Sequence, residues 1–308
     1  MMLQLCAAMV LCALAGGDAA PAFPSELVSF APYEKNPVFA GSGPGHWDET
    51  IRERGWILRE DDGYHLWYTG YALPESNVKK LGYATSPDGL NWTRYPGNPI
   101  YTEHWVEDMM VVKVDGTYYM FAECVNDEAH LLTSTDRVHW TRQGTLDIRK
   151  VNGEPLSPGP FGTPTAWYED GAWYLFYERD DEAIWLAVSK DLKTWTNLQD
   201  EPVLKRGPEA YDQDMLALDQ IIKYQGRYYA YYHGLIPKTN PQEWTSAIAV
   251  SPDLIHWTKY PGNPILKKDQ SSPVLVHDGS RFRLYSMHPD VRVHLPSGAP
   301  VPQAVGAK

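Results

Sequence analysis

Residues 171–176 read Gly-Ala-Trp-Tyr-Leu-Phe, a turn-forming glycine followed by a short aromatic strand. The same pattern begins at Gly63, Gly116, Gly226 and Gly279, so it occurs five times in the 308 residues. The intervals between successive glycines are 53, 55, 55 and 53 residues. Such regular spacing indicates an internal repeat, in which each unit is one small piece of supersecondary structure.

A second motif follows four of these five glycines. It consists of a strand, a Ser-x-Asp turn and a Trp-Thr pair, whose tryptophans are Trp92, Trp140, Trp195 and Trp257. Ser and Asp favour turns because their side chains hydrogen-bond to nearby backbone groups. Each repeat is therefore expected to contain about four short strands joined by tight turns.

Five four-stranded units predict an all-β fold, namely a five-bladed β-propeller in which each blade is a four-stranded antiparallel sheet. The unit that begins at Gly279 is too short to supply all of its strands. We therefore expect residues 27–39, near the N-terminus, to complete the fifth blade and close the ring. Residues 21–308 are expected to form a single domain without a long helix.

The composition excludes some functions. The chain has 27 Lys and Arg against 39 Asp and Glu, and 13% of its residues are aromatic. Nucleic-acid binding rests on Lys and Arg that neutralise phosphates, so an acidic chain without a basic stripe is not expected to bind nucleic acid. No apolar run beyond the N-terminus approaches the roughly 20 residues that span a bilayer. Aromatic rings with acids nearby suit sugars as ligands.

The N-terminus has the pattern of an export signal. Residues 1–15 are almost wholly apolar and are followed by small residues up to Ala20, which predicts a secretory signal peptide at residues 1–20. No Lys or Arg precedes the apolar run, which departs from the usual pattern. We expect a periplasmic or secreted protein without a lipid anchor. Cys124 is the one cysteine after this segment, which excludes an internal disulfide and a cysteine-cluster metal site.

Functional residues are expected on one face of the ring. The first strand of each blade starts on the face where the second strand ends, around the central channel, so a pocket lined by all blades can form there. Acidic residues gather at these positions, although Asp and Glu are disfavoured in strands. The candidates at first-strand starts are His46, Trp47, Asp48, Arg52, Glu53, Arg54, Asp108, Thr163, Asp214 and Gln220, and those at second-strand ends are Glu123, Glu178, His233 and His288.

With these motifs the sequence resembles the five-bladed, furanosidase-like glycoside hydrolases of families 43, 32 and 117, and the phosphorylase-containing family 130. The resemblance covers nearly the whole chain after the predicted signal peptide. It rests on the aromatic strands, the Ser-x-Asp turns with their Trp-Thr pairs, and two Tyr-Pro-Gly-Asn-Pro segments at residues 95–99 and 260–264. It implies a carbohydrate substrate and cleavage of glycosidic bonds, although fold alone does not give function.

The resemblance also implies roles for acids of the first two blades. In these hydrolases a blade-one Asp acts as nucleophile or base, and Asp48 is the candidate here, with Glu53 as its rival. A blade-two Asp adjusts the proton donor, and Asp108 matches it in position, although Glu107 and Met109 replace the usual flanking Arg and Pro.

The proton donor departs from the family pattern. The resemblance implies a Glu at the start of the inner strand of blade three, where this chain has Thr163. The available acids are Glu123 and Glu178, and His233 is a further option. Crowded carboxylates separate their pKa values, because two neighbouring negative charges disfavour simultaneous ionisation.

The remaining candidates are expected to contact the substrate. They are His46, Trp47, Arg52, Arg54, Thr163, Asp214, Gln220, His233 and His288. No cofactor is predicted, and neither a His-x-x-x-His nor a calcium-loop spacing indicates a metal site. The resemblance leaves room for a single ion in the central channel.

Three functions stand open at this point. The leading one is a glycoside hydrolase that uses channel-mouth carboxylates to stabilise an oxocarbenium-like transition state and to protonate the leaving group. The second is a glycan phosphorylase, in which Arg52, Arg54 and Arg179 would bind phosphate. The third is a non-catalytic glycan-binding propeller, which the absence of a blade-three Glu would favour.

Overall fold

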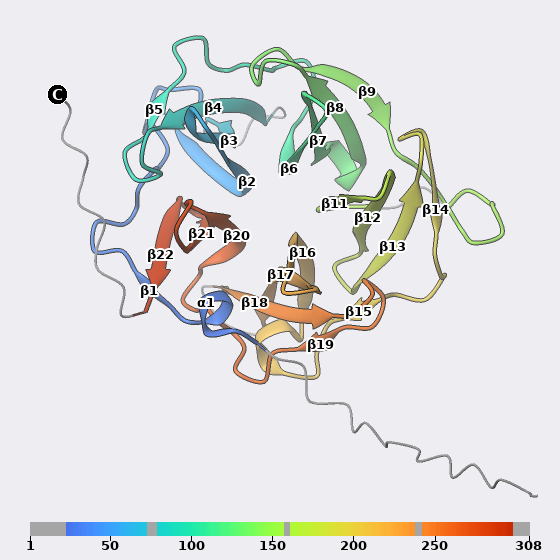
Figure 1. Ribbon diagram of the computed structural model, residues 1–308. Helices are drawn as coiled ribbons and strands as arrows, with labels where there is room; N and C mark the ends of the chain where they lie inside the picture. The colour runs from blue at the N-terminus through green and yellow to red at the C-terminus, as the bar shows by residue number, and fades with distance from the viewer. Residues whose placement is uncertain (1–22, 73–78, 157–160, 238–241, 298–308) are drawn as a thin grey trace, which may run out of the picture.

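The computed structural model describes residues 23–72, 79–156, 161–237 and 242–297, together with their side chains except that of Glu53. Five sheets of mainly antiparallel strands surround a central axis (Figure 1). The predicted five-bladed β-propeller is therefore confirmed. The predicted signal peptide, residues 1–20, lies outside the described part of the chain. Among the helices described, none has the length and apolar character needed to cross a bilayer.

The first two blades contain four antiparallel strands each. Blade one consists of β2 (Thr50–Glu60), β3 (Gly63–Tyr71), β4 (Lys80–Ser86) and β5 (Thr93–Arg94). Blade two consists of β6 (Glu107–Val114), β7 (Thr117–Glu123), β8 (Ala129–Ser134) and β9 (Thr141–Thr145). The short 3-10 helix η1 (Val125–Asp127) follows β7.

Blade three adds two short strands to the predicted four. Its main strands are β11 (Thr165–Glu169), β12 (Ala172–Arg179), β13 (Ala183–Ser189) and β14 (Thr194–Asn197). The additional strands are β10 (Asp147–Arg149), parallel to β14, and β15 (Leu204–Lys205), antiparallel to β13. Blade four consists of the 3-10 helix η2 (Ala210–Asp212), β16 (Met215–Tyr224), β17 (Arg227–Ile236), β18 (Glu243–Ser251) and β19 (Thr258–Lys259).

The fifth blade joins the two ends of the described chain. Its C-terminal strands are β20 (Ser271–His277), β21 (Phe282–His288) and β22 (Arg292–Pro296), and the helix α1 (Ser25–Val28) precedes β1 (Phe30–Pro32). Strand β1 pairs antiparallel with β22, and Phe39 bridges to Val291 (Figure 1). The expectation that residues 27–39 complete this blade is confirmed. Closure in this way holds the two ends of the described chain together in one sheet.

The repeated motifs form the turns that their residue types predict. Each of the five repeat glycines has a positive φ, between +77° and +126°, a conformation that a side chain disfavours. In the blade-one Ser-x-Asp turn, Ser86 donates to Asp88 at 3.0 Å and Asp88 accepts the amides of Leu90 and Asn91. The other three turns repeat this hydrogen bonding. The tandem repeat therefore has the same local chemistry in each copy.

Aromatic rings fill the joints between blades. Trp67 of blade one lies 6.0 Å from Trp140 of blade two in an edge-to-face contact, measured between ring centroids. Phe121 of blade two lies 5.6 Å from Trp173 and 5.9 Å from Trp195, both in blade three. Edge-to-face and tilted ring contacts of this kind add to the burial of large apolar surfaces. The high aromatic content therefore serves the core in large part.

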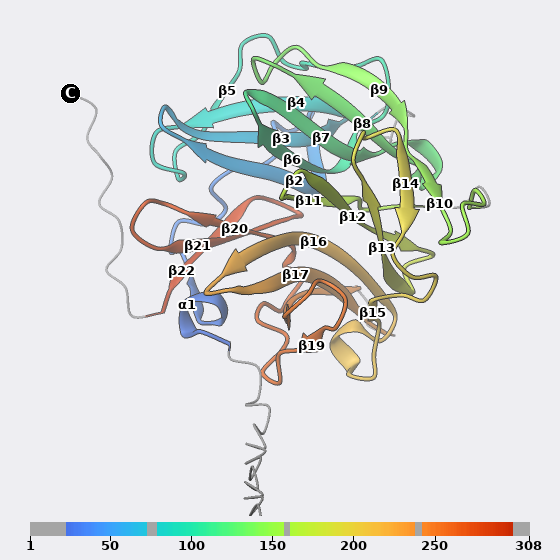
Figure 2. The ribbon, with the colours of Figure 1, turned by 45° about the vertical axis from the view of Figure 1, so that its right-hand side comes forward.

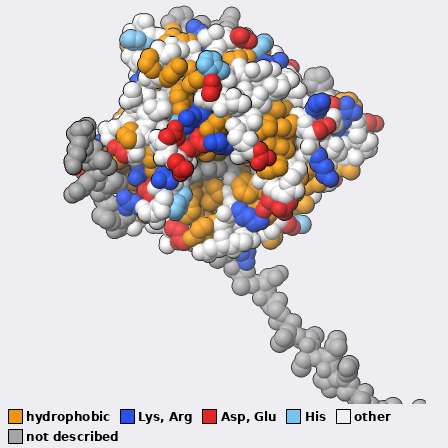
Figure 3. Space-filling view, turned by 45° about the horizontal axis from the view of Figure 1, so that its top comes forward, with side chains coloured by type: hydrophobic (Ala, Val, Ile, Leu, Met, Phe, Trp, Pro, Cys, Tyr) orange, Lys and Arg blue, Asp and Glu red, His pale blue; other side chains and the backbone are white. Residues whose placement is uncertain are grey.

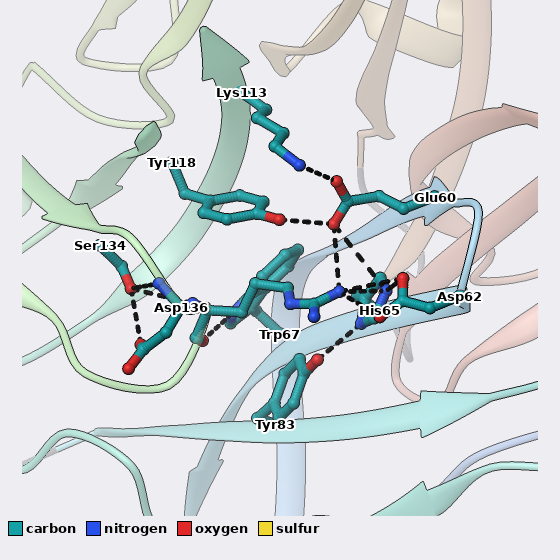
Figure 4. A network of polar contacts seen from close by, with 10 residues as sticks. Glu60, Asp62, His65, Trp67, Tyr83, Lys113, Tyr118, Ser134 and Asp136 are labelled. Carbon is teal, nitrogen blue, oxygen red and sulfur yellow. Dashed lines mark hydrogen bonds and ion pairs between the residues drawn. The ribbon is translucent and has the colours of Figure 1, made fainter. Parts of the chain in front are cut away.

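Ion pairs join neighbouring blades on the face opposite the starts of the first strands. Glu60, at the end of β2, pairs with Lys113 and accepts a hydrogen bond from the Tyr118 hydroxyl at 2.6 Å, both in blade two (Figure 4). Glu169 of blade three pairs in the same way with Lys223 and Tyr228 of blade four. The same contact of a Glu with a Lys and a Tyr of the next blade therefore occurs at two joints between blades.

Three potential metal ligands, Glu60, Asp62 and His65, lie together in this first joint. The guanidinium of Arg137 already occupies the space among them, 2.8 Å from both Asp62 Oδ2 and His65 Nε2. A bound cation would repel this guanidinium. The cluster is therefore a joint between blades one and two.

On the face seen in Figure 3, acidic and basic side chains are interspersed with hydrophobic ones.

Candidate active site at the channel mouth

The strand registers bring the predicted positions together on one face. Glu107, at the start of β6, pairs with Glu123 at the end of β7, and Ser271 pairs with His288 in blade five. First-strand starts and second-strand ends therefore lie side by side at the channel mouth. Several acids there are almost fully buried, which is costly for a carboxylate unless it is protonated, paired or hydrogen-bonded.

Glu123 and Glu178 converge on the backbone at Gly162, just before β11. A Cβ atom at Gly162 would overlap Oε1 of Glu178 and lie 2.9 Å from Oε2 of Glu123. Glu123 accepts the backbone N–H of Thr163 at 3.0 Å, and Glu178 accepts that of Asp181 at 2.7 Å. The glycine makes room for both carboxyl groups, so blades two and three each contribute one acid to a common site.

These two acids favour the protonated form. Burial, followed by the negative charge of Asp181, raises the pKa of Glu178 to about 8. Burial, with the charges of Asp108 and Glu107, also raises the pKa of Glu123 well above its usual value. A carboxyl group that keeps its proton at neutral pH can act as a general acid.

Asp108 and Arg54 form the floor of this site. The Asp108 carboxylate accepts the backbone N–H of Arg54 at 2.8 Å, and the Asp108 backbone has a positive φ of +43°. The Arg54 guanidinium is fully buried and donates to the carbonyls of Asp108, Pro164, Leu218 and Asp219. Arg54 thus connects the inner strands of blades one to four. This placement favours a structural role for Arg54 over the substrate contact expected from the sequence.

Asp219 and His233 form a buried pair within blade four. The carboxylate oxygens of Asp219 lie 2.9 and 3.1 Å from Nδ1 of His233, and Asp219 has no exposed surface. Burial lowers the pKa of His233, but Asp219, with Asp108 and Asp181, outweighs it and raises this pKa overall. The bond to Asp219 fixes the imidazole orientation, and no hydrogen bond joins Nε2 to another of the described residues. The Trp244 ring lies against the imidazole, with 5.4 Å between ring centroids.

Asp48 lies in a different environment from these acids. Its side chain is 2% exposed, forms an ion pair with Arg94 Nε at 2.8 Å and accepts the Tyr68 hydroxyl at 3.1 Å. The Trp47 ring stacks near Tyr68, with 5.9 Å between centroids. The contacts of the Asp48 carboxylate and of the Trp47 ring are thus all made within blade one. The side chain of Glu53, the rival of Asp48, is outside the described set.

The other predicted contacts are placed differently from one another. Gln220 is buried and links blade four to blade five. Its amide N–H donates to the carbonyl of Leu275, and its amide oxygen accepts the backbone N–H of Leu275. Asp214 and His46 are exposed. His288 is half-buried beside the charged groups of the mouth, and burial lowers its pKa. Arg52 is half-buried and Thr163 is buried, next to Glu123.

Sequence reasoning missed several residues of the mouth. Glu107 forms an ion pair with buried Lys79 and accepts the indole N–H of Trp105 at 2.5 Å. Asp181 and Asp219 were not among the candidates either. Asp181 stands three residues after Glu178, just beyond the end of the second strand, and this position could have identified it as a candidate from the sequence. Asp219 lies in the blade-four stretch that the sequence marks, next to Gln220, but the sequence assigned it no role. It stands at a register shift in β16, and its carboxylate lies 2.9 Å from Nδ1 of His233.

Comparisons in sequence and in structure found proteins that are similar to this chain. No family model matches it. A 1,2-beta-oligomannan phosphorylase of Thermoanaerobacter sp. (strain X514) is 25% identical over 214 residues, which cover 64% of this chain and 69% of that protein. The relationship is thus detectable in sequence across the larger part of both chains.

Solved structures share the fold over most of the length. The beta-1,2-mannobiose phosphorylase from Listeria innocua has a TM-score of 0.66 and 17% identity, covering 86% of this chain and 95% of that one. A family 130 structure, reported with hydrolases that target beta-1,2 mannosidic linkages in Candida mannan, has a TM-score of 0.67 and 15% identity, covering 91% and 97%. A family 43 glycoside hydrolase has the same fold. At these identities the likeness shows the fold alone, which phosphorylases and hydrolases share.

Proposed function

We propose that this protein hydrolyses glycosidic bonds in β-1,2-linked mannosides and that Glu178 is its proton donor. The convergence of Glu123 and Glu178 at Gly162 supports this most directly, because it holds a protonated carboxyl group among further acids. Glycosidic cleavage needs one protonated acid for the leaving group and one carboxylate near the anomeric carbon. The mouth residues supply both kinds of group.

In this mechanism Glu178 protonates the glycosidic oxygen as the bond to the anomeric carbon breaks. Asp108 is the proposed second carboxylate, since its charge acts on Glu123, His233 and His288 and it is thus central among the mouth groups. It would stabilise the developing positive charge on the sugar and orient a water molecule for attack. Burial and the negative charge of Asp181 keep the proton on Glu178.

His233 is proposed to hold a sugar hydroxyl group. Asp219 fixes its ring, and the raised pKa keeps Nε2 protonated over a wider pH range than in a free histidine. Trp244 beside it offers an apolar surface for the C–H face of the sugar. The linkage and sugar in the proposal come from the relatives, which are named for β-1,2-linked mannose units.

Hydrolysis is preferred to phosphorolysis because the buried basic groups near the mouth are already engaged. The guanidinium of Arg54 donates to backbone carbonyls, and Lys79 pairs with Glu107. A phosphate would therefore meet the charges of Asp108 and its neighbours without these cations to offset them. Phosphorolysis remains the second candidate, because two of the similar proteins are named phosphorylases.

The test is incubation of the purified protein with β-1,2-mannobiose and β-1,2-linked oligomannan, with and without inorganic phosphate. We expect free mannose at the same rate in both conditions, measured by anion-exchange chromatography. Production of mannose 1-phosphate only when phosphate is present would replace hydrolysis by phosphorolysis. Binding of the oligomannan without either product would favour the non-catalytic glycan-binding propeller.

A further inference from the structure

A hollow lies in the side of the propeller, between blades two and three. Its volume is about 500 Å³, and it is lined by β7, β8, β9 and the turn between β13 and β14. These strands of the two blades lie side by side in Figure 2. The lining begins at Thr117, at the opposite end of β7 from Glu123, so the hollow is separate from the channel mouth. Cavities of 300–1,000 Å³ are typical of ligand sites.

The hollow exists because one repeat departs from the others. The residue after the Asp of each Ser-x-Asp turn has a positive φ and is Gly89, Arg137, Leu192 or Leu254 in blades one to four. Leu254 is 3% exposed in the joint with blade three, and Arg137 fills the joint between blades one and two with ion pairs. Leu192 is only half-buried and lines the hollow. This joint is therefore packed less completely than its two counterparts.

The outer wall of the hollow is also irregular. The register of β8 and β9 shifts between Leu131 and Leu132, and Gly144 opposite has a φ of +126°. A bulge of this kind bends the strand and is often found near functional sites. Both Leu131 and Gly144 line the hollow, so the bulge shapes its wall.

The lining combines apolar surface with uncharged hydrogen-bonding groups. Leu131, Leu146 and Leu192 supply the apolar part, and Tyr119 supplies a half-buried ring whose hydroxyl makes no hydrogen bond to the described residues. The Gln143 amide donates a hydrogen bond to the Thr133 hydroxyl at 2.8 Å, and both are uncharged polar groups of the lining. The charged residues Asp191 and Lys193 are one of each sign and give the lining no net charge.

We infer that this hollow is a second carbohydrate-binding site, which holds a neutral stretch of a polysaccharide at a distance from the channel mouth. An aromatic ring, leucine side chains and uncharged polar groups match the C–H faces and hydroxyl groups of a sugar chain. An anionic or cationic ligand would find no excess of the opposite charge. The identity of the sugar rests on the proposed function, whereas the existence of the site does not.

Affinity electrophoresis in gels that contain soluble β-1,2-linked mannan tests the inference. We expect mannan to retard the wild-type protein, and Tyr119→Ala and Gln143→Ala to weaken the binding at least threefold. Turnover of β-1,2-mannobiose, which reaches only the channel mouth, should stay unchanged in both variants. Tyr95→Ala removes a tyrosine that is 39% exposed in blade one and serves as the matched control.

Equal retardation of the wild type and both variants would overturn the inference, as would an equal loss in Tyr95→Ala. Leu192→Trp, which fills the hollow, gives an independent check and should weaken retardation as well. Retardation that depends on Tyr119 in a protein that does not cleave mannobiose would support this site and refute the proposed function. Cleavage of mannobiose without any retardation by mannan would support the proposed function and refute this second site.

Discussion

Asp48 of blade one and Asp212 of blade four have matching surroundings. Asp48 pairs with Arg94 at 2.8 Å, and Asp212 pairs with Lys259 at 2.5 Å. Both basic residues come directly before the Tyr-Pro-Gly-Asn-Pro segment of their blade. Both carboxylates are buried, with 2% and 0% of their surface exposed. The similarity extends to the acid, its cation and the position of that cation in the repeat.

The surrounding groups repeat as well. The Asn98 amide donates to the Tyr68 hydroxyl at 3.2 Å, and the Asn263 amide donates to the Tyr232 hydroxyl at 3.3 Å. In each blade this tyrosine hydroxyl also reaches the Asp, at 3.1 Å in blade one and 3.4 Å in blade four. An arrangement that occurs twice, once on each side of the ring, serves a need that the two blades share.

Glu123 and Glu178 present the opposite case. They come from neighbouring blades but converge on one glycine, and burial together with neighbouring charges raises the pKa of each. The comparison teaches that burial of an acid at this face is not by itself a sign of catalysis. A carboxylate with a matched cation stabilises its blade, whereas carboxyl groups that are crowded without one are suited to proton transfer.

The largest effect is expected from Glu178→Gln. Loss of the proton donor should reduce the turnover of β-1,2-mannobiose by about 10²–10⁴-fold, the usual contribution of general acid catalysis. The glutamine keeps the size of the side chain, so the thermal midpoint should stay near that of the wild type. Glu154→Gln, at an exposed glutamate with a Lys150 partner 3.6 Å away, is the control and should keep full activity.

Asp48→Asn and Asp212→Asn test the equivalence of the two pairs. Each change removes the negative charge of a buried carboxylate and leaves its partly exposed cation unpaired, which costs about 2 kcal/mol of unfolding free energy in a hydrogen-bonded charged pair. Urea unfolding should therefore show similar losses for both, and the folded fraction should keep its activity. A stable Asp48→Asn variant with turnover reduced a hundredfold would instead return Asp48 to the role of nucleophile or base.

The pH dependence of turnover sharpens the assignment of the proton donor. Glu178 must be protonated to act, and its pKa is raised to about 8, so activity should be retained below this pH and lost as pH rises through it. Asp181→Asn removes one of the charges that raise this pKa but keeps the backbone N–H that Glu178 accepts. The basic limb of the kcat/KM profile should then move to lower pH by less than about one unit. An unmoved limb would argue against Glu178.

The smallest effect is expected at the repeated joints on the far face. Glu60→Gln and Glu169→Gln each remove one partner of a partly exposed ion pair, whose lysine side chain is 41% exposed in both cases. Such pairs contribute about 0.2–1 kcal/mol, so both losses should be small and alike. Denaturant midpoints measured at low and high salt would check this, because added salt should narrow the difference from the wild type.

The fold was accessible from the sequence because each repeat carries its own turn chemistry. The five glycines, the Ser-x-Asp turns and the short last unit predicted the blades and their closure, and the structure confirms all three. The meeting of first-strand starts and second-strand ends on one face followed from the strand order alone. These features depend on local hydrogen bonds and backbone conformation, which the residue types determine.

The details of the site were less accessible, because they depend on side chains that meet across blades. Asp48 was chosen for its position before β2, but that loop directs its carboxylate to Arg94, forty-six residues away in the chain. Arg54 was expected at the surface of the pocket, and its carbonyl partners lie in three other blades. Contacts of this range follow from the closed ring and leave no short-range signal in the sequence.

The buried guanidinium of Arg54 has a consequence for how the ring holds together. Its N–H groups donate to backbone carbonyls of blades two, three and four, so one side chain of blade one links the innermost strands of four blades at the hub. These blades cannot separate without breaking several hydrogen bonds to a single charged group. Arg54 should therefore make the four blades unfold as one cooperative unit.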